Sequence, residues 1–278
     1  MCDSCDSASP PPPSPSAESE DLTAGPLNDL LNGFERFRRT YLHGEAELFD
    51  RLVQQGQAPK AMLIGCSDSR VDPAILTHCE PGDLFIVRNV AAIVPPRDAD
   101  GHHHGTSSAI EFGVRGLKVR HIIVLGHAFC GGVKALARES DPQTARDYEF
   151  LDDWVAIVRP ARDQVWERFA DLAEVHDIRR LLEQATVLQS VANLFTFPWL
   201  RERLEQGLLS VHAWYFDLSE RELFVFDAVR HRFRSLANPL APCETERRLA
   251  LLQGVRAPDD LALERFLDAE EEALRNRR

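Results

Sequence analysis

Three short apolar runs constrain the fold of this chain more than any other feature of its sequence. They cover residues 61–65, 84–88 and 121–125, and each has the length and composition of a buried strand. The stretch 106–118, between the last two runs, has helical character. Two strands joined by a crossover helix are typical of a parallel sheet. The sequence therefore predicts an α/β fold with a mostly parallel central β-sheet flanked by helices.

The segments around these runs complete the predicted architecture. Leucine and aromatic residues recur every three or four positions in 27–55, which predicts an N-terminal helical arm. The other expected elements are a largely helical region over 152–206 with breaks near Pro160 and Pro198, a closing hairpin formed by 208–217 and 222–227, and a charged amphipathic C-terminal helix over 259–278. Such a helix is expected to pack on the domain surface, and a subunit contact is the alternative.

The first 26 residues differ in composition from the rest of the chain. Residues 1–26 are dominated by proline, serine and acidic side chains. Such a segment cannot bury enough apolar surface to offset the entropy lost on ordering, so we expect a disordered tail. Cys2 and Cys5 form a single Cys-x-x-Cys pair there, which is half of a zinc site with no second pair nearby.

Charge and cysteine content argue against several classes of partner and location. The net charge is −12 and no long lysine or arginine cluster occurs, which argues against nucleic acid or an anionic membrane as a partner. The six cysteines show no compact disulfide spacing, which fits reduced thiols or metal thiolates in a reducing compartment. Neither a signal peptide nor an apolar stretch of the ~20 residues that a membrane span needs is visible, so we expect a cytoplasmic location.

Metal-binding side chains follow two of the three apolar runs. Cys66 comes directly after the first run, and His127 and Cys130 follow the third. Ligand sites of open α/β sheets lie beyond the carboxyl ends of the strands, so neighbouring parallel strands would bring these three side chains together. Two thiolates and one imidazole leave the fourth position of a tetrahedral zinc ion open, as in catalytic zinc sites. The alternative is that each of the three is an ordinary buried core residue.

Asp68 and Arg70 are expected to form a second layer at the predicted zinc site. Their spacing places both on the same side of a tight turn, where a salt bridge would keep Asp68 ionised and oriented. An oriented carboxylate beside zinc accepts a hydrogen bond from hydroxide on the metal, or itself binds the metal. The alternative is an Asp–Arg pair that only stabilises the turn.

These motifs resemble the signature sequences of the β-carbonic anhydrases, in particular those of the plant-like branch of that family. The resemblance rests on CSDSRV at 66–71, EPGDLFIVRN at 80–89, GTSSAIEF at 105–112, HAFCGG at 127–132, VANL at 191–194 and VHAW at 211–214. It covers about residues 27–240. The resemblance therefore implies a catalytic domain over 27–240, followed by a C-terminal extension over 241–278 that contains the amphipathic helix.

The resemblance implies a zinc enzyme that hydrates carbon dioxide. One zinc ion per chain would be held by Cys66, His127 and Cys130, with Asp68 and Arg70 as the catalytic dyad. In such an enzyme, zinc-bound hydroxide attacks carbon dioxide and gives bicarbonate and a proton in a reversible reaction. The family fold has an N-terminal helix that embraces a second subunit, which implies a homodimer or a higher homo-oligomer.

The substrate-binding residues carry over from the family in the same way. Gln57, nine residues before the first ligand, matches the substrate-binding glutamine of the plant-like branch. Phe85, Val90 and Gly131 match residues that line a small apolar pocket. Phe112 is a departure, because that branch usually has tyrosine there and phenylalanine lacks the hydroxyl for a hydrogen bond.

Two other functions are compatible with the sequence. The same site could hydrolyse carbon disulfide or carbonyl sulfide, which share the linear shape of carbon dioxide. The protein could instead be a non-catalytic zinc-binding regulatory protein. A structural zinc site has no need of the Asp68–Arg70 pair, so that pair argues against the regulatory alternative.

One branch of the family has a second bicarbonate site, and this chain departs from it. In that branch, bicarbonate stabilises an inactive form in which the dyad aspartate leaves its arginine and binds zinc. The site resembles a Trp-Arg-Tyr trio, of which this chain keeps Arg88 but has Leu63 and Phe216 at the other two positions. Bicarbonate beside leucine and phenylalanine would be poorly paired, which is costly. The sequence therefore predicts that Asp68 stays on Arg70 at neutral pH.

Overall fold

The chain was analysed as a computed structural model that describes six stretches of the sequence. They are residues 25–44, 46–98, 104–138, 148–169, 175–236 and 262–275. The predicted tail lies almost wholly outside them, as do Cys2, Cys5 and the part of the C-terminal extension that precedes its helix. The chain divides into two compact units between Gly56 and Gln57, and each is described by itself.

The N-terminal unit is helical, as predicted, but its helix is not continuous. An α-helix, α1 (Pro26–Phe37), passes into the π-helical segment η1 (Arg38–Gly44), and a second α-helix, α2 (Ala46–Gln55), follows. The interruption coincides with a glycine, which has the lowest helix propensity of any residue except proline. Phe37 and Phe49 hold the two α-helices together, with ring centroids 5.5 Å apart in an edge-to-face arrangement.

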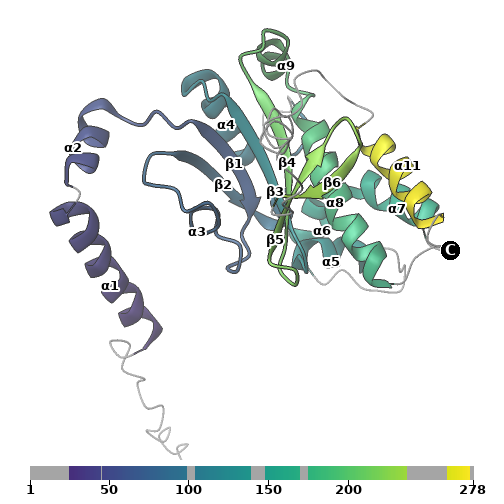
Figure 1. The fold of residues 1–278 in the computed structure, drawn as a ribbon, viewed down its shortest axis with the longest axis horizontal. Coiled ribbons are helices and arrows are strands. Elements are labelled where there is room, and N and C mark those ends of the chain that lie inside the picture. The colour runs from purple at the N-terminus through teal and green to yellow at the C-terminus, as the bar shows by residue number, and fades with distance from the viewer. Residues whose placement is uncertain are drawn as a thin grey trace, which may run out of the picture. The chain divides into compact units, whose positions relative to one another are not determined.

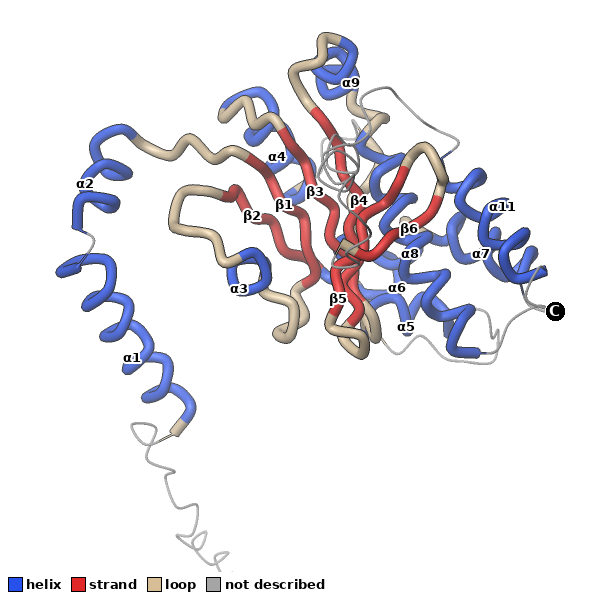
Figure 2. The backbone as a smooth tube through the Cα atoms, in the orientation of Figure 1, coloured by secondary structure: helices blue, strands red, loops and turns tan. Residues whose placement is uncertain are grey.

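The main unit is built on one six-stranded sheet in the order β2-β1-β3-β4-β5-β6 (Figures 1 and 2). The strands are β1 (Ala61–Cys66), β2 (Leu84–Asn89), β3 (His121–His127), β4 (Ser210–Asp217), β5 (Glu222–Asp227) and β6 (Arg232–Ser235). The first four strands in the order pair in parallel, and β5 is antiparallel to both of its neighbours, β4 and β6. The mostly parallel sheet and the closing hairpin are therefore confirmed. The additional strand β6 was missed because only one of its four residues is apolar.

Helices flank this sheet along the rest of the described chain. They are α3 (Pro73–Thr77), η2 (Val90–Ala92), α4 (Gly105–Glu111), η3 (Phe112–Gly116), α5 (Gly131–Arg138), α6 (Leu151–Ala156), α7 (Arg159–Phe169), α8 (Val175–Leu194), α9 (Pro198–Glu205) and α11 (Ala262–Arg275). The predicted crossover helix is α4 with η3. The breaks expected near Pro160 and Pro198 are also found. Each proline lies in the first turn of a new helix, where its missing N–H removes no hydrogen bond. Within the described ranges, no helix is long and apolar enough to span a membrane.

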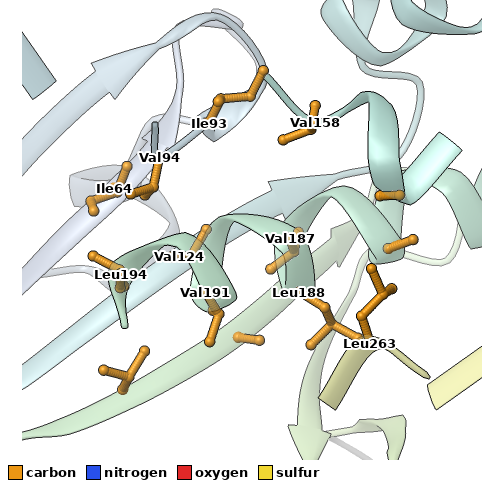
Figure 3. Packing of buried hydrophobic residues seen from close by; sticks show 14 of the residues in the cluster. Ile64, Ile93, Val94, Val124, Val158, Val187, Leu188, Val191, Leu194 and Leu263 are labelled. Carbon is orange, nitrogen blue, oxygen red and sulfur yellow. The ribbon is translucent and has the colours of Figure 1, made fainter. Parts of the chain in front are cut away.

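The main hydrophobic core lies between the sheet and the helices that Figure 1 shows gathered on one side of it. Figure 3 shows Val187, Val191 and Leu194 of α8 near Val124 of β3 and Ile64 of β1. All six residues of β1 are buried, which is typical of a central strand in a parallel sheet. The C-terminal helix α11 joins this core through its buried apolar residues Leu263, Phe266 and Leu267. It therefore packs on the domain, as the sequence predicts.

A glycine near the end of β3 allows α8 to approach the sheet closely. A Cβ atom on Gly126 would lie 2.3 Å from Cγ2 of Val187, far inside van der Waals contact. Valine is branched at Cβ and has little rotamer freedom within a helix, so it cannot turn away cheaply. The distance between α8 and the strand that carries His127 is thus set by the absence of a side chain at Gly126.

We predict that Gly126→Ala lowers the free energy of unfolding by about 1–3 kcal/mol, because a methyl group must be forced into a packed core. Denaturant titration measures the loss. Adding Val187→Ala should recover much of it, since the second change opens the space that the first one needs. Gly131→Ala is the matched control, because a Cβ there meets nothing within 4 Å. Native stability of Gly126→Ala would contradict this packing.

Candidate metal centre

Three predicted ligands meet at the carboxyl ends of two neighbouring strands. Cys66 is the last residue of β1 and His127 is the last residue of β3, while Cys130 follows three residues later. One ligand atom from each side chain lies within 4.8 Å of the other two. All three side chains are buried. The parallel pairing of β1 with β3 therefore brings together residues more than sixty positions apart in the sequence.

The geometry of the three side chains fits a tetrahedral zinc ion. The two sulfur atoms are 4.0 Å apart, close to the ~3.8 Å that follows from Zn–S distances near 2.3 Å. Nδ1 of His127 lies 2.8 Å from the carbonyl oxygen of Ala128 and donates its hydrogen to it. This leaves Nε2 as the basic nitrogen, and it is buried without a hydrogen-bond partner among the described residues. A buried nitrogen lone pair aimed at two thiols is what a metal site requires.

The electrostatics of the cluster favour a thiolate even before a metal is considered. The Cys130 thiol donates to Cys66 and is the largest cause that lowers the pKa of Cys66. His127 and the backbone N–H of Asp68, 3.4 Å from the Cys66 sulfur, act in the same direction. The interaction with Cys66, together with burial, raises the pKa of Cys130. One proton is thus shared between two sulfur atoms, and thiolate is the form that binds metals.

Asp68 and Arg70 form the predicted salt bridge beside the ligands. Nε of Arg70 donates to Oδ1 of Asp68 at 2.9 Å, and a terminal nitrogen donates to Oδ2 at 2.7 Å. These bonds hold the pKa of Asp68 well below its usual range, so the carboxyl group is ionised. Oδ2 also lies 4.0 Å from Nε2 of His127. Arg70 donates in addition to the carbonyl oxygen of Phe129, so it links the two loops that carry the ligands.

A family model for carbonic anhydrase matches residues 61–223, more than half of the chain. A carbonic anhydrase of Synechocystis is 35% identical over 219 residues, which are 78% of each chain. The chain belongs to the β-carbonic anhydrase family. The solved structure of the β-carbonic anhydrase CcaA has a TM-score of 0.69 and 33% identity over 75% of this chain and 98% of its own. Two tetrameric β-carbonic anhydrases of the ascomycete Sordaria macrospora are represented by a structure with a TM-score of 0.62, 28% identical, over 77% of this chain and 98% of that one.

As a member of this family, the protein is a zinc-dependent carbonic anhydrase that hydrates carbon dioxide reversibly. The three-ligand cluster gives the zinc ion a place in this chain. Among the described residues, it is the single group of three or more histidine, cysteine or acidic side chains close enough to hold a metal ion. The prediction of a zinc enzyme, made from the two motifs, is therefore confirmed at the level of the family and its cofactor.

In this carbonic anhydrase, Arg88 fastens the loop that follows the first ligand. It donates to the carbonyl oxygens of Cys66 at 2.9 Å and Asp68 at 2.7 Å, and to the carboxylate of Asp72 at 2.6 Å. Asp72 also caps the first turn of α3 by accepting from the backbone of Ala74. The hydrogen-bond donors of Arg88 are therefore used to hold this loop. The role of Asp72 was not predicted from the sequence, although an aspartate directly before a proline is a common helix start.

Glu183 of α8 supports the second ligand loop and was also missed from the sequence. One of its carboxylate oxygens accepts from the backbone N–H of Cys130 at 3.3 Å, and the other accepts from the hydroxyl of Tyr215 at 2.7 Å. Glu183 is almost fully buried, and this burial raises its pKa. The sequence carried no clear signal for it, because Arg179 and Arg180 lie three or four positions away and make Glu183 look like part of a solvated helix face.

The residues expected to bind substrate lie in two groups. Phe85 of β2 packs against Phe112, with ring centroids 5.8 Å apart, and both remain partly exposed. Val90 is also partly exposed and lies next to the start of α5, where Gly131 is the first residue. Gln57 lies in the exposed segment that precedes β1. Each of these residues is therefore at least partly exposed.

We predict that Glu183→Ala lowers zinc affinity by about 10- to 100-fold, the usual cost of removing a group that supports a metal ligand. It should also lower the free energy of unfolding by about 2–4 kcal/mol, because two buried donors lose their acceptor. Competition with a chelator and denaturant titration measure the two effects. Glu183→Gln keeps an acceptor and should lose less. Tyr215→Phe removes only the hydrogen bond between Tyr215 and Glu183, so it separates the effect of that bond from the effect of the bond to Cys130. If Glu183→Ala bound zinc as tightly as the native protein does, Glu183 would have no role in supporting the loop that carries Cys130.

Proposed function

We propose that Cys66, His127 and Cys130 bind the catalytic zinc ion of this carbonic anhydrase. The observation that carries the proposal is the convergence of three buried ligand atoms within 4.8 Å at the carboxyl ends of β1 and β3. Zinc bound there would lower the pKa of a water ligand towards ~7 and so supply hydroxide at neutral pH. One such set per chain gives one zinc ion per chain.

Asp68 and Arg70 orient the attacking group in this proposal. Because Arg70 keeps Asp68 ionised, the carboxylate can only accept hydrogen bonds. Its Oδ2 atom, 4.0 Å from the free nitrogen of His127, faces the ligand cluster. A hydroxide ion that donates its hydrogen to Oδ2 has its lone pairs directed away from Asp68, towards the substrate carbon. At the second bicarbonate site, the fully buried Leu63 and the half-buried Phe216 offer no polar group to an anion, so no bicarbonate would favour the release of Asp68 from Arg70.

The substrate pocket is proposed from residues that the family resemblance singles out. Carbon dioxide carries no net charge, so the apolar surfaces of Phe85 and Val90 suit it better than they suit water. The backbone of Gly131 lies at the start of α5. The side-chain amide of Gln57 donates a hydrogen bond to the substrate oxygen that becomes negative as bicarbonate forms. Phe112 contributes apolar area and no hydrogen bond.

A homodimer or a higher homo-oligomer is proposed as the working assembly. The exposed side of α1 is apolar and includes Leu27, Leu30, Leu31 and Phe34, each more than half exposed. In the main unit, the edge strand β2 and its neighbours expose Ile86, Val90 and Phe112. Apolar surface of this kind marks protein–protein contacts. The relatives from Sordaria macrospora are described as tetrameric, which supports a homo-oligomer for this chain as well.

The remaining proposals concern location and the ends of the chain. The net charge of −12 supports small-molecule substrates over nucleic acid or membrane partners. Free thiols at Cys66, Cys79 and Cys130 support a reducing compartment such as the cytoplasm. The catalytic domain is proposed to span residues 27–240, with the tail 1–26 dispensable for catalysis and the extension 241–278 contributing the packed helix α11.

We predict that Cys130→Ala removes both zinc and carbon dioxide hydration, because two ligands cannot hold the ion at a catalytic site. Metal analysis of the purified protein and a stopped-flow hydration assay measure the two losses. Cys79→Ala is the matched control, since this third described cysteine is free and lies outside the cluster, and it should retain one zinc ion per chain. Full zinc occupancy in Cys130→Ala would refute the ligand assignment.

We predict that Asp68→Asn keeps zinc but lowers kcat by about 100- to 1000-fold, the usual effect of losing one preorganised polar group at a reacting centre. An amide cannot accept with the same charge, and its NH₂ group would face Arg70 unfavourably. Hydration of carbon dioxide should be measured beside hydrolysis of carbon disulfide and carbonyl sulfide. Native turnover of carbon dioxide in Asp68→Asn would exclude the dyad from the reaction, and a preference for either sulfur compound in the native enzyme would favour the alternative substrate class.

A further inference from the structure

A cavity of about 450 Å³ lies between three helices on the side of the sheet that carries the main core. It is bounded by α5, α7 and α8, which Figure 1 shows on that side. Its apolar walls are formed by Val133, Ala137, Trp166, Ile178 and Leu182. This volume falls within the ~300–1,000 Å³ that small-molecule sites usually have. None of these residues belongs to the proposed zinc site or carbon dioxide pocket.

Among the residues that the structure describes, both charged side chains that line the cavity are cationic. Lys134 of α5 and Arg179 of α8 lie at its wall, and no acidic side chain of the described residues does. Within the described stretches, neither cation forms a salt bridge, although Arg179 interacts electrostatically with the buried Glu183 one turn along α8. The protein as a whole carries a net charge of −12, so two cations at one apolar cavity, with no salt bridge to any described residue, differ from the rest of the chain. Charge and apolar surface are therefore combined at one place.

Arg179 is held in position without using its hydrogen-bond donors. Its guanidinium carbon lies 4.4 Å from the ring centroid of Phe129, a cation–π arrangement that occupies the face of the group. The N–H groups at the edge of the guanidinium have no hydrogen-bond partner among the described residues, and their fork matches a carboxylate or sulfonate. Lys134 adds a second, flexible positive charge from the facing helix.

We propose that this cavity binds a small organic anion that has an apolar body and one carboxylate or sulfonate group. The aromatic or short aliphatic body would fill the space beside Trp166 and Leu182, and the acidic group would lie between Lys134 and Arg179. Bicarbonate does not fit this description, because it has no apolar part and is far smaller than the cavity. The site is thus separate from the substrate site and takes a different class of ligand.

The probe for this proposal is 8-anilinonaphthalene-1-sulfonate, titrated by fluorescence into the full-length, zinc-loaded protein. We expect one saturable site per chain and displacement by octanoate, which shares the anion and the apolar body. N-phenyl-1-naphthylamine has the same rings without the sulfonate and should bind about tenfold more weakly. Equal affinity for the charged and uncharged probes would overturn the role of the two cations.

Two variants locate the bound probe. Ala137→Trp fills the cavity and should abolish saturable binding, whereas Lys134→Gln with Arg179→Gln keeps the space and should weaken sulfonate binding about tenfold or more. Arg201→Gln with Lys118→Gln, which removes the same charge from positions that do not line the cavity, should bind as the native protein does. Circular dichroism and zinc content confirm that each variant is folded. Absence of saturable binding to the native protein, or binding that both cavity variants leave unchanged, would overturn the proposal.

Discussion

β1 and β3 lie side by side in parallel, with Ala61 opposite His121 and Gly65 opposite Leu125. This pairing places Cys66 beside the loop that begins at His127, and every other part of the centre depends on it. Successive side chains of a strand point to opposite faces of the sheet, so a slip of one residue would turn Cys66 away from its partners. Burial of β1 on both faces makes such a slip costly, because each of its apolar side chains would have to be repacked.

The loops that carry the ligands are fixed by charged groups from other elements. Arg88 binds the loop after β1, Arg70 joins that loop to the one after β3, and Glu183 holds the second loop from α8. Each group satisfies backbone donors or acceptors that strand pairing leaves open at the end of the sheet. The backbone bends sharply at Phe129, which has a positive φ of 58° although it is not glycine. Hydrogen bonds on both sides of this residue compensate for the strain.

The sequence predicted the site best where apolar runs that form strands are followed directly by metal-binding or charged residues. The three apolar runs predicted three strands in the correct places, and the residues after them predicted the ligand cluster and the Asp68–Arg70 pair. Glu183 and Tyr215 could not be paired from the sequence, because their contact is made between a helix and a strand separated by 32 positions. The cavity between α5, α7 and α8 was equally inaccessible, since helix periodicity shows which face is apolar but not how closely two faces pack.

X-ray absorption at the zinc edge of the purified enzyme shows directly whether two cysteines and one histidine bind the zinc ion. We expect two sulfur neighbours at about 2.3 Å, one histidine nitrogen at about 2.0–2.1 Å and one further light atom in the open position. The Cys130→Ala protein, if any zinc remains in it, should have lost one sulfur neighbour. A shell of nitrogen and oxygen alone, or a shell of four sulfur atoms, would contradict the assignment of Cys66, His127 and Cys130.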